Sequence, residues 1–310
     1  MAINKAMQMA LKLLSYPDLD VSKTYKMERA IKELVGTHPA PEDCEIWNLE
    51  VPVGDHGVPV RMFRTRGTQP TGGIVYFHGG GWVTGNIDSY TRVCSNIARA
   101  TGRVVASVDY RLAPEFPFPA GVEDCYGVAR WAYQGGGGAD LPVDGLTLMG
   151  DSAGGNLAAV TALLARDRGE FSVPQQILLY PATANRHGAA SPYPSAEENG
   201  TDYLLTNRRI EEYLELYIQR EEDWNSPYFA PLLAEDLSRQ PRTLIITAEY
   251  DPLRDEGEDY GRRLVQAGNL VEVHRLADAL HGFISLPQRF EHVQKTMALV
   301  RAFLEGGAQA

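Results

Sequence analysis

The sequence predicts an α/β protein built on a mostly parallel, doubly wound sheet. A series of β-rich apolar runs occurs between about residues 72 and 280, and helix-like stretches follow most of them. These runs are GGIVYFH, RVVASVDY, GLTLMG, QQILLYPA, RTLIITAEY and LVEVHRLA. Unbroken apolar strands that alternate with helices indicate a parallel sheet covered on both faces. Ligands of such sheets bind beyond the carboxyl ends of the strands, which directs attention to residues 78–81, Asp109, Ser152 and Asp251.

Two segments interrupt the alternation of strands and helices. Residues 1–45 have a helical pattern, and their first part, MAINKAMQMALKLLSYPDLD, reads as an amphipathic helix rather than the apolar core of a signal peptide. Residues 183–225 combine a polar loop with an amphipathic helix between two strand signals. We expect the second segment to form a cap over the carboxyl ends of the strands, although a surface excursion is the alternative. The catalytic core then comprises residues 46–182 and 226–310.

Composition narrows the classes of function. The chain has 310 residues, 44% of them hydrophobic, which is enough apolar material for a large core. A formal net charge of −11 disfavours nucleic acid and anionic membrane surfaces as partners. The three cysteines, Cys44, Cys94 and Cys125, are widely spaced and suit a reducing cytoplasm better than a disulfide framework. No apolar run is long enough to cross a bilayer, so we expect a cytoplasmic protein.

Ser152 lies where the strand pattern GLTLM gives way to a helical pattern. Glycines at positions 150 and 154 flank it at G-x-S-x-G spacing, the pattern of a nucleophile on a sharp strand-to-helix turn. Glycine is needed there because a side chain would obstruct both the turn and the approach of a substrate. The pattern alone is equally typical of an ordinary tight junction, so the rest of the chain must decide.

A glycine run follows the first core strand, in His78-Gly79-Gly80-Gly81-Trp82. Consecutive glycines leave backbone N–H groups unshielded, and such groups can converge on a developing oxyanion. A glycine-rich surface loop is the alternative. If Ser152 is a nucleophile, the N–H of Ala153 would be a further donor.

A serine nucleophile requires a base and a group that orients the base. His281 follows the last strand and is the best candidate base among the seven histidines, and His78 is better explained as a brace of the glycine loop. Asp251 follows the preceding strand and is the candidate acid, although Asp-Pro also fits a helix N-cap. Asp255 and Glu256 are second choices. The order serine, aspartate, histidine is that of α/β hydrolases.

At this point the chain resembles the hormone-sensitive-lipase-like esterases, or bacterial family IV carboxylesterases, of the α/β-hydrolase fold. The matching segments are HGGGW (78–82), DYRLAPE (109–115), GDSAGGN (150–156), DPLRDE (251–256), HGF (281–283), SPYPSAEENG (191–200) and SPYFAPL (226–232). The resemblance implies that residues 1–45 and 183–225 together form a helical cap. It also implies a triad of Ser152, Asp251 and His281. It implies oxyanion donors among Gly79, Gly80, Gly81 and Ala153, of which we prefer the last three.

The resemblance also implies a substrate class. It predicts hydrolysis of short- to medium-chain acyl esters through an acyl-enzyme, with no metal or organic cofactor and with homodimerisation through the last strand and its neighbouring helix. Trp82, Tyr180 and Phe283 are candidates for shaping the substrate pocket. An amidase or peptidase of the same fold is one alternative. A non-catalytic receptor for a small ligand is another, and His281 argues against it because the receptors that resemble this family lack the catalytic histidine.

Overall fold

A mixed sheet forms the centre of the molecule. The computed structural model describes residues 20–36 and 41–306. Within this part of the chain the sheet has eight strands in the order β1-β2-β4-β3-β5-β6-β7-β8. The strands are β1 (Cys44–Val53), β2 (His56–Thr65), β3 (Gly73–Phe77), β4 (Val104–Val108), β5 (Thr147–Asp151), β6 (Gln175–Leu179), β7 (Arg242–Tyr250) and β8 (Val271–Leu280). The predicted apolar runs correspond to β3–β8, and these strands are parallel, which confirms the predicted class.

The first two strands form an antiparallel hairpin at one edge of the sheet. Gly54 and Asp55 make the turn between them, and β2 pairs antiparallel with β4. Their exposed and buried residues mix along each strand, because only part of the hairpin is covered by the rest of the molecule. The hairpin therefore extends the sheet away from the strands that carry the predicted site residues.

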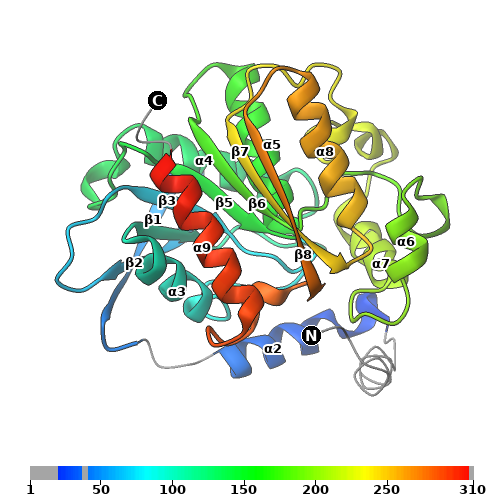
Figure 1. Cartoon of the computed structure of the whole chain (residues 1–310), viewed down its shortest axis with the longest axis horizontal. Helices are drawn as coiled ribbons and strands as arrows, with labels where there is room; N and C mark the ends of the chain where they lie inside the picture. The colour runs from blue at the N-terminus through cyan, green and yellow to red at the C-terminus, as the bar shows by residue number, and fades with distance from the viewer. Residues whose placement is uncertain (1–19, 37–40, 307–310) are drawn as a thin grey trace.

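Five long helices cover the two faces of the sheet (Figure 1). On one face lie α3 (Thr91–Thr101) and α9 (Glu291–Gly306), and on the other lie α4 (Ala120–Tyr133), α5 (Ala153–Arg168) and α8 (Arg254–Gln266). Alternate residues of β3 divide between the two cores. Ile74 and Tyr76 pack with α3 and α9, whereas Val75 and Phe77 pack with α4 and α5. This two-sided burial explains the unbroken apolar strands.

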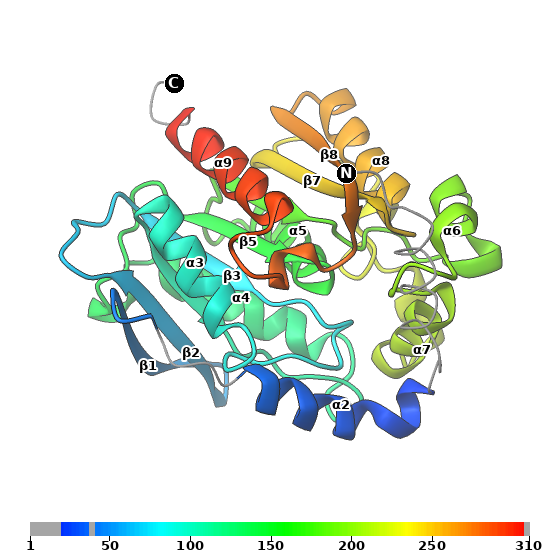
Figure 2. The same ribbon diagram turned by 60° about the horizontal axis from the view of Figure 1, so that its bottom comes forward.

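Three further helices lie outside these layers, at the carboxyl ends of the parallel strands (Figures 1 and 2). They are α2 (Val21–Gly36), α6 (Pro194–Asn199) and α7 (Asn207–Tyr217), and α2 contacts α7. Short 3₁₀ helices occupy Gly136–Gly138, Gly188–Ala190, Glu221–Asn225, Pro231–Leu233 and Phe283–Ser285. The helix expected in residues 1–19 lies outside the described residues. Across residues 20–36 and 41–306, no helix is long and apolar enough to span a bilayer.

Candidate active site

Ser152 occupies a strained turn between β5 and α5. Its φ of 55° and ψ of −121° are unusual for a residue with a side chain, and such strain typically costs about 1–3 kcal/mol. The flanking glycines are required by space. A Cβ on Gly150 would lie 2.1 Å from the carbonyl oxygen of Gly154, and a Cβ on Gly154 would lie 2.0 Å from that of Phe77. The structure therefore places Ser152 on the sharp turn that the G-x-S-x-G spacing predicts.

His281 and Asp251 form a hydrogen-bonded chain with Ser152. The Nε2 atom of His281 lies 2.9 Å from Ser152 Oγ, and its Nδ1 atom lies 2.7 Å from Asp251 Oδ2. Asp251 is fully buried and follows β7, whereas His281 follows β8 and keeps 12% of its side chain exposed. The other carboxylate oxygen of Asp251 accepts the backbone N–H of Leu253 at 2.9 Å. The same aspartate thus caps the turn before α8 and orients the histidine.

Two of the three preferred candidates for backbone donors belong to the glycine loop and line the pocket. Gly80 and Gly81 line the pocket beside Ser152 and adopt φ of 129° and 62°, which side chains disfavour. A Cβ on Gly81 would lie 2.5 Å from the ring of Tyr213. Ala153 also lines the pocket, and as the first residue of α5 its N–H has no acceptor within the helix.

Gly79 does not fit the expected role of an oxyanion donor. Its N–H donates to Asp151 Oδ1 and to the Tyr90 hydroxyl, each at 3.0 Å. It is also absent from the residues that line the pocket. The prediction of Gly79 as a candidate oxyanion donor is therefore wrong, because the buried Asp151 carboxylate already accepts this N–H group.

The sequence did not indicate the cluster of tyrosines that surrounds Asp151, next to the glycine loop. The Asp151 carboxylate accepts the hydroxyls of Tyr76 at 2.7 Å and Tyr90 at 3.0 Å, with the Tyr180 hydroxyl at 3.4 Å. Burial raises the pKa of Asp151, and the hydrogen bonds from Tyr76, Tyr90 and Gly79 oppose that rise. The tyrosines come from separate segments, so only the folded chain brings them to Asp151.

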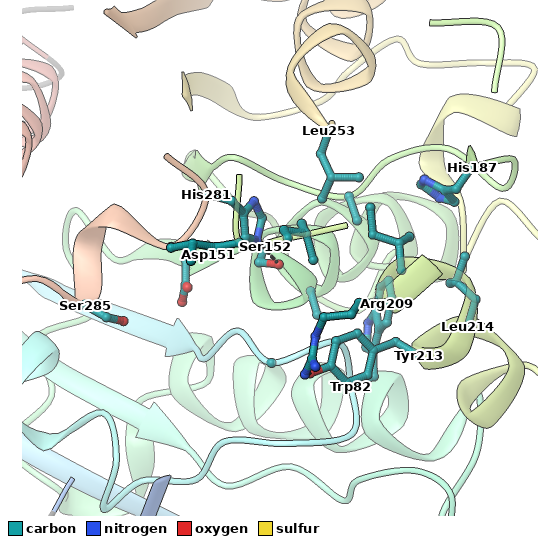
Figure 3. A pocket seen from close by; sticks show the side chains of 18 of the residues that line it. Trp82, Asp151, Ser152, His187, Arg209, Tyr213, Leu214, Leu253, His281 and Ser285 are labelled. Carbon is teal, nitrogen blue, oxygen red and sulfur yellow. Dashed lines mark hydrogen bonds between the residues drawn. The ribbon is translucent and has the colours of Figure 1, made fainter. Parts of the chain in front are cut away.

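A cavity of about 490 Å³ opens in front of Ser152 and His281 (Figure 3). Much of the apolar part of its wall comes from Trp82 and from residues 183–225, which contain α7 and are called the inserted segment below. Trp82 stacks on Tyr217 with ring centroids 4.6 Å apart. Polar side chains from three helical elements also line it. Apart from Ser152, His281 and the glycine loop, the lining includes Lys32, Ala182, His187, Leu204, Leu205, Arg209, Ile210, Tyr213, Leu214, Leu253 and Ser285.

Two of the three residues expected to shape this cavity lie elsewhere. Tyr180 is fully buried and packs edge-on against the His281 ring, with centroids 4.8 Å apart. Phe283 is also buried and packs against Tyr180 at 4.8 Å. Neither lines the cavity, whereas Trp82 does. The prediction of Tyr180 and Phe283 as pocket residues is therefore wrong, because Tyr180 packs against the His281 ring and Phe283 packs against Tyr180.

The second-choice acids have structural partners instead of the histidine. Asp255 bonds to Arg254 and accepts the backbone N–H of Ser195. Glu256 is buried, and its Oε1 accepts the N–H groups of Thr183 and Ala184 at 2.7 and 3.1 Å. Burial raises the pKa of Glu256 to about 8. Both acids therefore tie α8 to the inserted segment.

The remaining pocket histidine is His187, which sequence analysis placed only in the insertion. It is 7% exposed, its Nε2 lies 3.1 Å from the carbonyl oxygen of Ala184, and its Nδ1 lies 3.4 Å from Glu256 Oε2. Burial lowers its pKa to about 4. His78 is also buried with a pKa lowered to about 4, and its Nδ1 lies 2.9 Å from the carbonyl oxygen of Gly79. No cluster of three metal-ligating side chains occurs among the described residues.

A serine on a strand-to-helix turn, hydrogen-bonded through a histidine to an aspartate at the carboxyl ends of parallel strands, defines the class of the α/β hydrolases. A family model described as alpha/beta hydrolase fold matches residues 74–285, and the chain belongs to this family. The expected resemblance to the hormone-sensitive-lipase-like esterases is confirmed.

Several of the chain's relatives are named as ester hydrolases. The chain is 36% identical over 252 residues to an arylesterase of Saccharolobus solfataricus, covering 80% of each chain. It is 31% identical to an ethyl acetate hydrolase of Pseudomonas putida, covering 93% of this chain and 91% of that one. Among solved structures, a hyperthermophilic esterase from Pyrobaculum calidifontis matches with a TM-score of 0.85 and 36% identity over 100% of both chains. The expected class of enzyme is thereby confirmed.

Proposed function

We propose that this protein is a carboxylesterase that cleaves short- to medium-chain acyl esters through an acyl-enzyme on Ser152. The observation that carries the proposal is the hydrogen-bonded chain from Ser152 through His281 to Asp251, beside a cavity whose wall includes Gly80, Gly81 and Ala153. The ester hydrolases among its relatives support the same class of substrate.

The chemistry of the Asp251 carboxylate indicates which nitrogen of His281 carries the proton. An ionised carboxylate only accepts hydrogen bonds, so Asp251 requires the proton of His281 to be on Nδ1. The lone pair of Nε2 then faces the Ser152 hydroxyl. Ser152 Oγ attacks the ester carbonyl while His281 takes its proton and then donates it to the leaving alcohol. Water attacks the acyl-enzyme by the reverse sequence, and Ser152 is regenerated.

The developing oxyanion would be held by the N–H groups of Gly80, Gly81 and Ala153. All three residues line the cavity beside Ser152. Removal of one such donor typically costs about 10² to 10³ in rate in other acyl-transfer enzymes. The acyl chain would contact the apolar part of the wall, formed by Ile210 and Leu214 of α7 and by Leu253, which precedes α8.

We also propose that residues 1–45 and 183–225 form a cap on a core of residues 46–182 and 226–310. Support comes from α2 and α7, which lie together over the carboxyl ends of the strands and both contribute to the cavity wall. The backbone N–H of Val21 donates to Glu212 at 3.0 Å, which joins the start of α2 to α7. Homodimerisation remains a prediction that a sedimentation measurement would check.

The decisive experiment compares the wild type with Ser152→Ala on p-nitrophenyl esters from acetyl to palmitoyl. We expect turnover that is greatest for short or medium acyl chains and a loss of at least about 10³-fold in the variant. A parallel series of p-nitroanilides tests the amidase alternative. Activity that survives in purified Ser152→Ala, or turnover of anilides but not esters, would contradict the proposal. Ligand binding without turnover by folded wild type would instead favour a receptor.

A further inference from the structure

The peptide group between Gly80 and Gly81 is held from its carbonyl side. The Gly80 oxygen accepts hydrogen bonds from the backbone N–H of Val83 at 3.2 Å, the N–H of Thr84 at 2.9 Å and the Thr84 hydroxyl at 3.0 Å. A trans peptide is planar, with its C=O and N–H pointing in opposite directions. Whatever fixes the Gly80 carbonyl therefore also fixes the N–H of Gly81, one of the proposed oxyanion donors.

The hydrogen-bond chain continues to a charged residue on α2. Lys32 Nζ lies 2.7 Å from Thr84 Oγ1. An ammonium has no lone pair to accept with, so Lys32 donates and the Thr84 hydroxyl turns its own proton towards Gly80. The chain thus runs in one direction, from the cation through the hydroxyl to the carbonyl oxygen. Chains of aligned hydrogen bonds polarise one another, and a charged donor strengthens the effect.

Contacts of Arg29 seat α2 on the same loop. Its Nε donates to the carbonyl oxygen of Val83 and one Nη to that of Ala113, both at 2.7 Å. The guanidinium also pairs with Glu115 at 2.9 Å.

Lys32 lies one turn after Arg29 on α2. Desolvation lowers the pKa of the Lys32 ammonium, and the nearby Glu28 carboxylate raises it. Lys32 thus approaches the loop on a helix that is anchored one turn earlier.

We propose that Lys32 and Thr84 are positioning residues of the oxyanion site, which orient and polarise the Gly80–Gly81 peptide so that the Gly81 N–H binds the oxyanion more strongly. The inference rests on the proposed esterase function and deepens it. Because the oxyanion exists only after attack on the carbonyl, the loss of the chain should lower kcat and leave KM nearly unchanged. The helix that covers the site therefore takes part in stabilising the transition state.

The test uses Lys32→Met and Thr84→Val in the full chain with a neutral p-nitrophenyl ester. Each variant should lower kcat by about tenfold, less than the 10² to 10³ expected for removal of a donor, and change KM by less than about twofold. Binding of a trifluoromethyl ketone, which forms a tetrahedral oxyanion on the serine, should weaken by a similar factor. Thr84→Ser, which keeps the hydroxyl, should restore activity. The double variant should be no worse than either single one, because both break one chain.

Lys26→Met is the matched control, since Lys26 is exposed on the same helix and has no part in the chain. It should retain wild-type kcat. An equal loss in Lys26→Met, a raised KM with unchanged kcat, or unchanged ketone binding in Lys32→Met would overturn the proposal. Thermal unfolding separates loss of the fold from loss of the chain, and Lys32→Met remains decisive if Thr84→Val does not fold. Failure of the esterase proposal itself is recognised separately, as activity that survives Ser152→Ala.

Discussion

Asp251 has a different partner on each of its carboxylate oxygens. Oδ2 meets His281 Nδ1, and Oδ1 accepts the N–H of Leu253. Asp251→Asn can retain the second contact through its amide oxygen, so we expect the variant to fold. Its amide NH₂ group would then face His281 and favour the wrong tautomer, which lowers kcat by about 10⁴ in a comparable triad. Steady-state kinetics with a p-nitrophenyl ester, alongside circular dichroism, measure the effect.

Asp255→Asn is the control for this prediction. Asp255 bonds to Arg254 and to the Ser195 N–H, and it does not contact His281. Because Asp255 does not contact the reacting groups, its replacement by Asn should change kcat by less than about threefold. The assignment of the acid would be wrong if Asp255→Asn lost activity while Asp251→Asn retained it.

Residues defined by local pattern were the easiest to predict. Ser152, Asp251 and His281 each follow a strand, and strand ends meet at one edge of a parallel sheet, so the sequence could indicate that they lie together. Gly79 and Phe283 are close in the chain to Gly80 and His281, but Gly79 donates its N–H to Asp151 and Phe283 packs against Tyr180. Their environments depend on segments distant in sequence, which a local pattern does not describe.

Among the elements, α8 carries a buried acid that joins it to the inserted segment. Glu256 accepts two backbone N–H groups from that segment, and burial raises its pKa from 4.5 to about 8. The folded state therefore binds this proton more tightly than the unfolded state. Between these two pKa values the free energy of unfolding falls as pH rises, and the contribution is fully lost above about pH 8.

Glu256→Gln should remove this dependence on pH, because the amide keeps an acceptor for the two N–H groups and does not ionise. Each pKa unit corresponds to about 1.4 kcal/mol, so the variant should gain roughly 1–4 kcal/mol relative to the wild type between pH 5 and pH 8. Urea unfolding at several pH values measures the difference. Parallel stability curves for the two proteins would show that Glu256 is ionised throughout.

The elements themselves were predictable to different extents. Strands β3–β7 are buried along all or most of their length and appear in the sequence as apolar runs. Strand β8 and the β1–β2 hairpin mix exposed and buried residues, and the hairpin gives the weaker signal in the sequence. The seat of α2 on the glycine loop could not be anticipated. Arg29 donates hydrogen bonds to the backbone carbonyl oxygens of Val83 and Ala113. Every residue has such an oxygen, so the sequence does not indicate which ones Arg29 contacts.

At the scale of the whole molecule, the two helical segments over the site are joined by an ion pair. Arg209 on α7 lies 2.8 Å from Glu28 on α2, with both side chains less than a quarter exposed. Glu28→Arg or Arg209→Glu alone places like charges in contact and should lower both the thermal midpoint and kcat. The double exchange restores opposite charges and should recover at least half of the lost midpoint, with a coupling energy of about 1–3 kcal/mol. Additive losses would show that the two helices are not coupled through this pair.

The same ion pair has a consequence for how the protein is made. Glu28 and Arg209 are 181 positions apart in the chain, and ribosomes add about 5–20 residues per second, so roughly ten to forty seconds separate their synthesis. During that interval α2 has left the exit tunnel but the helix it packs against does not yet exist. The nascent chain therefore carries α2 without its α7 contact through most of translation, with only its partners at residues 83–115 already synthesised. The uncovered face of this amphipathic helix makes it a ligand for chaperones that protect emerging polypeptides.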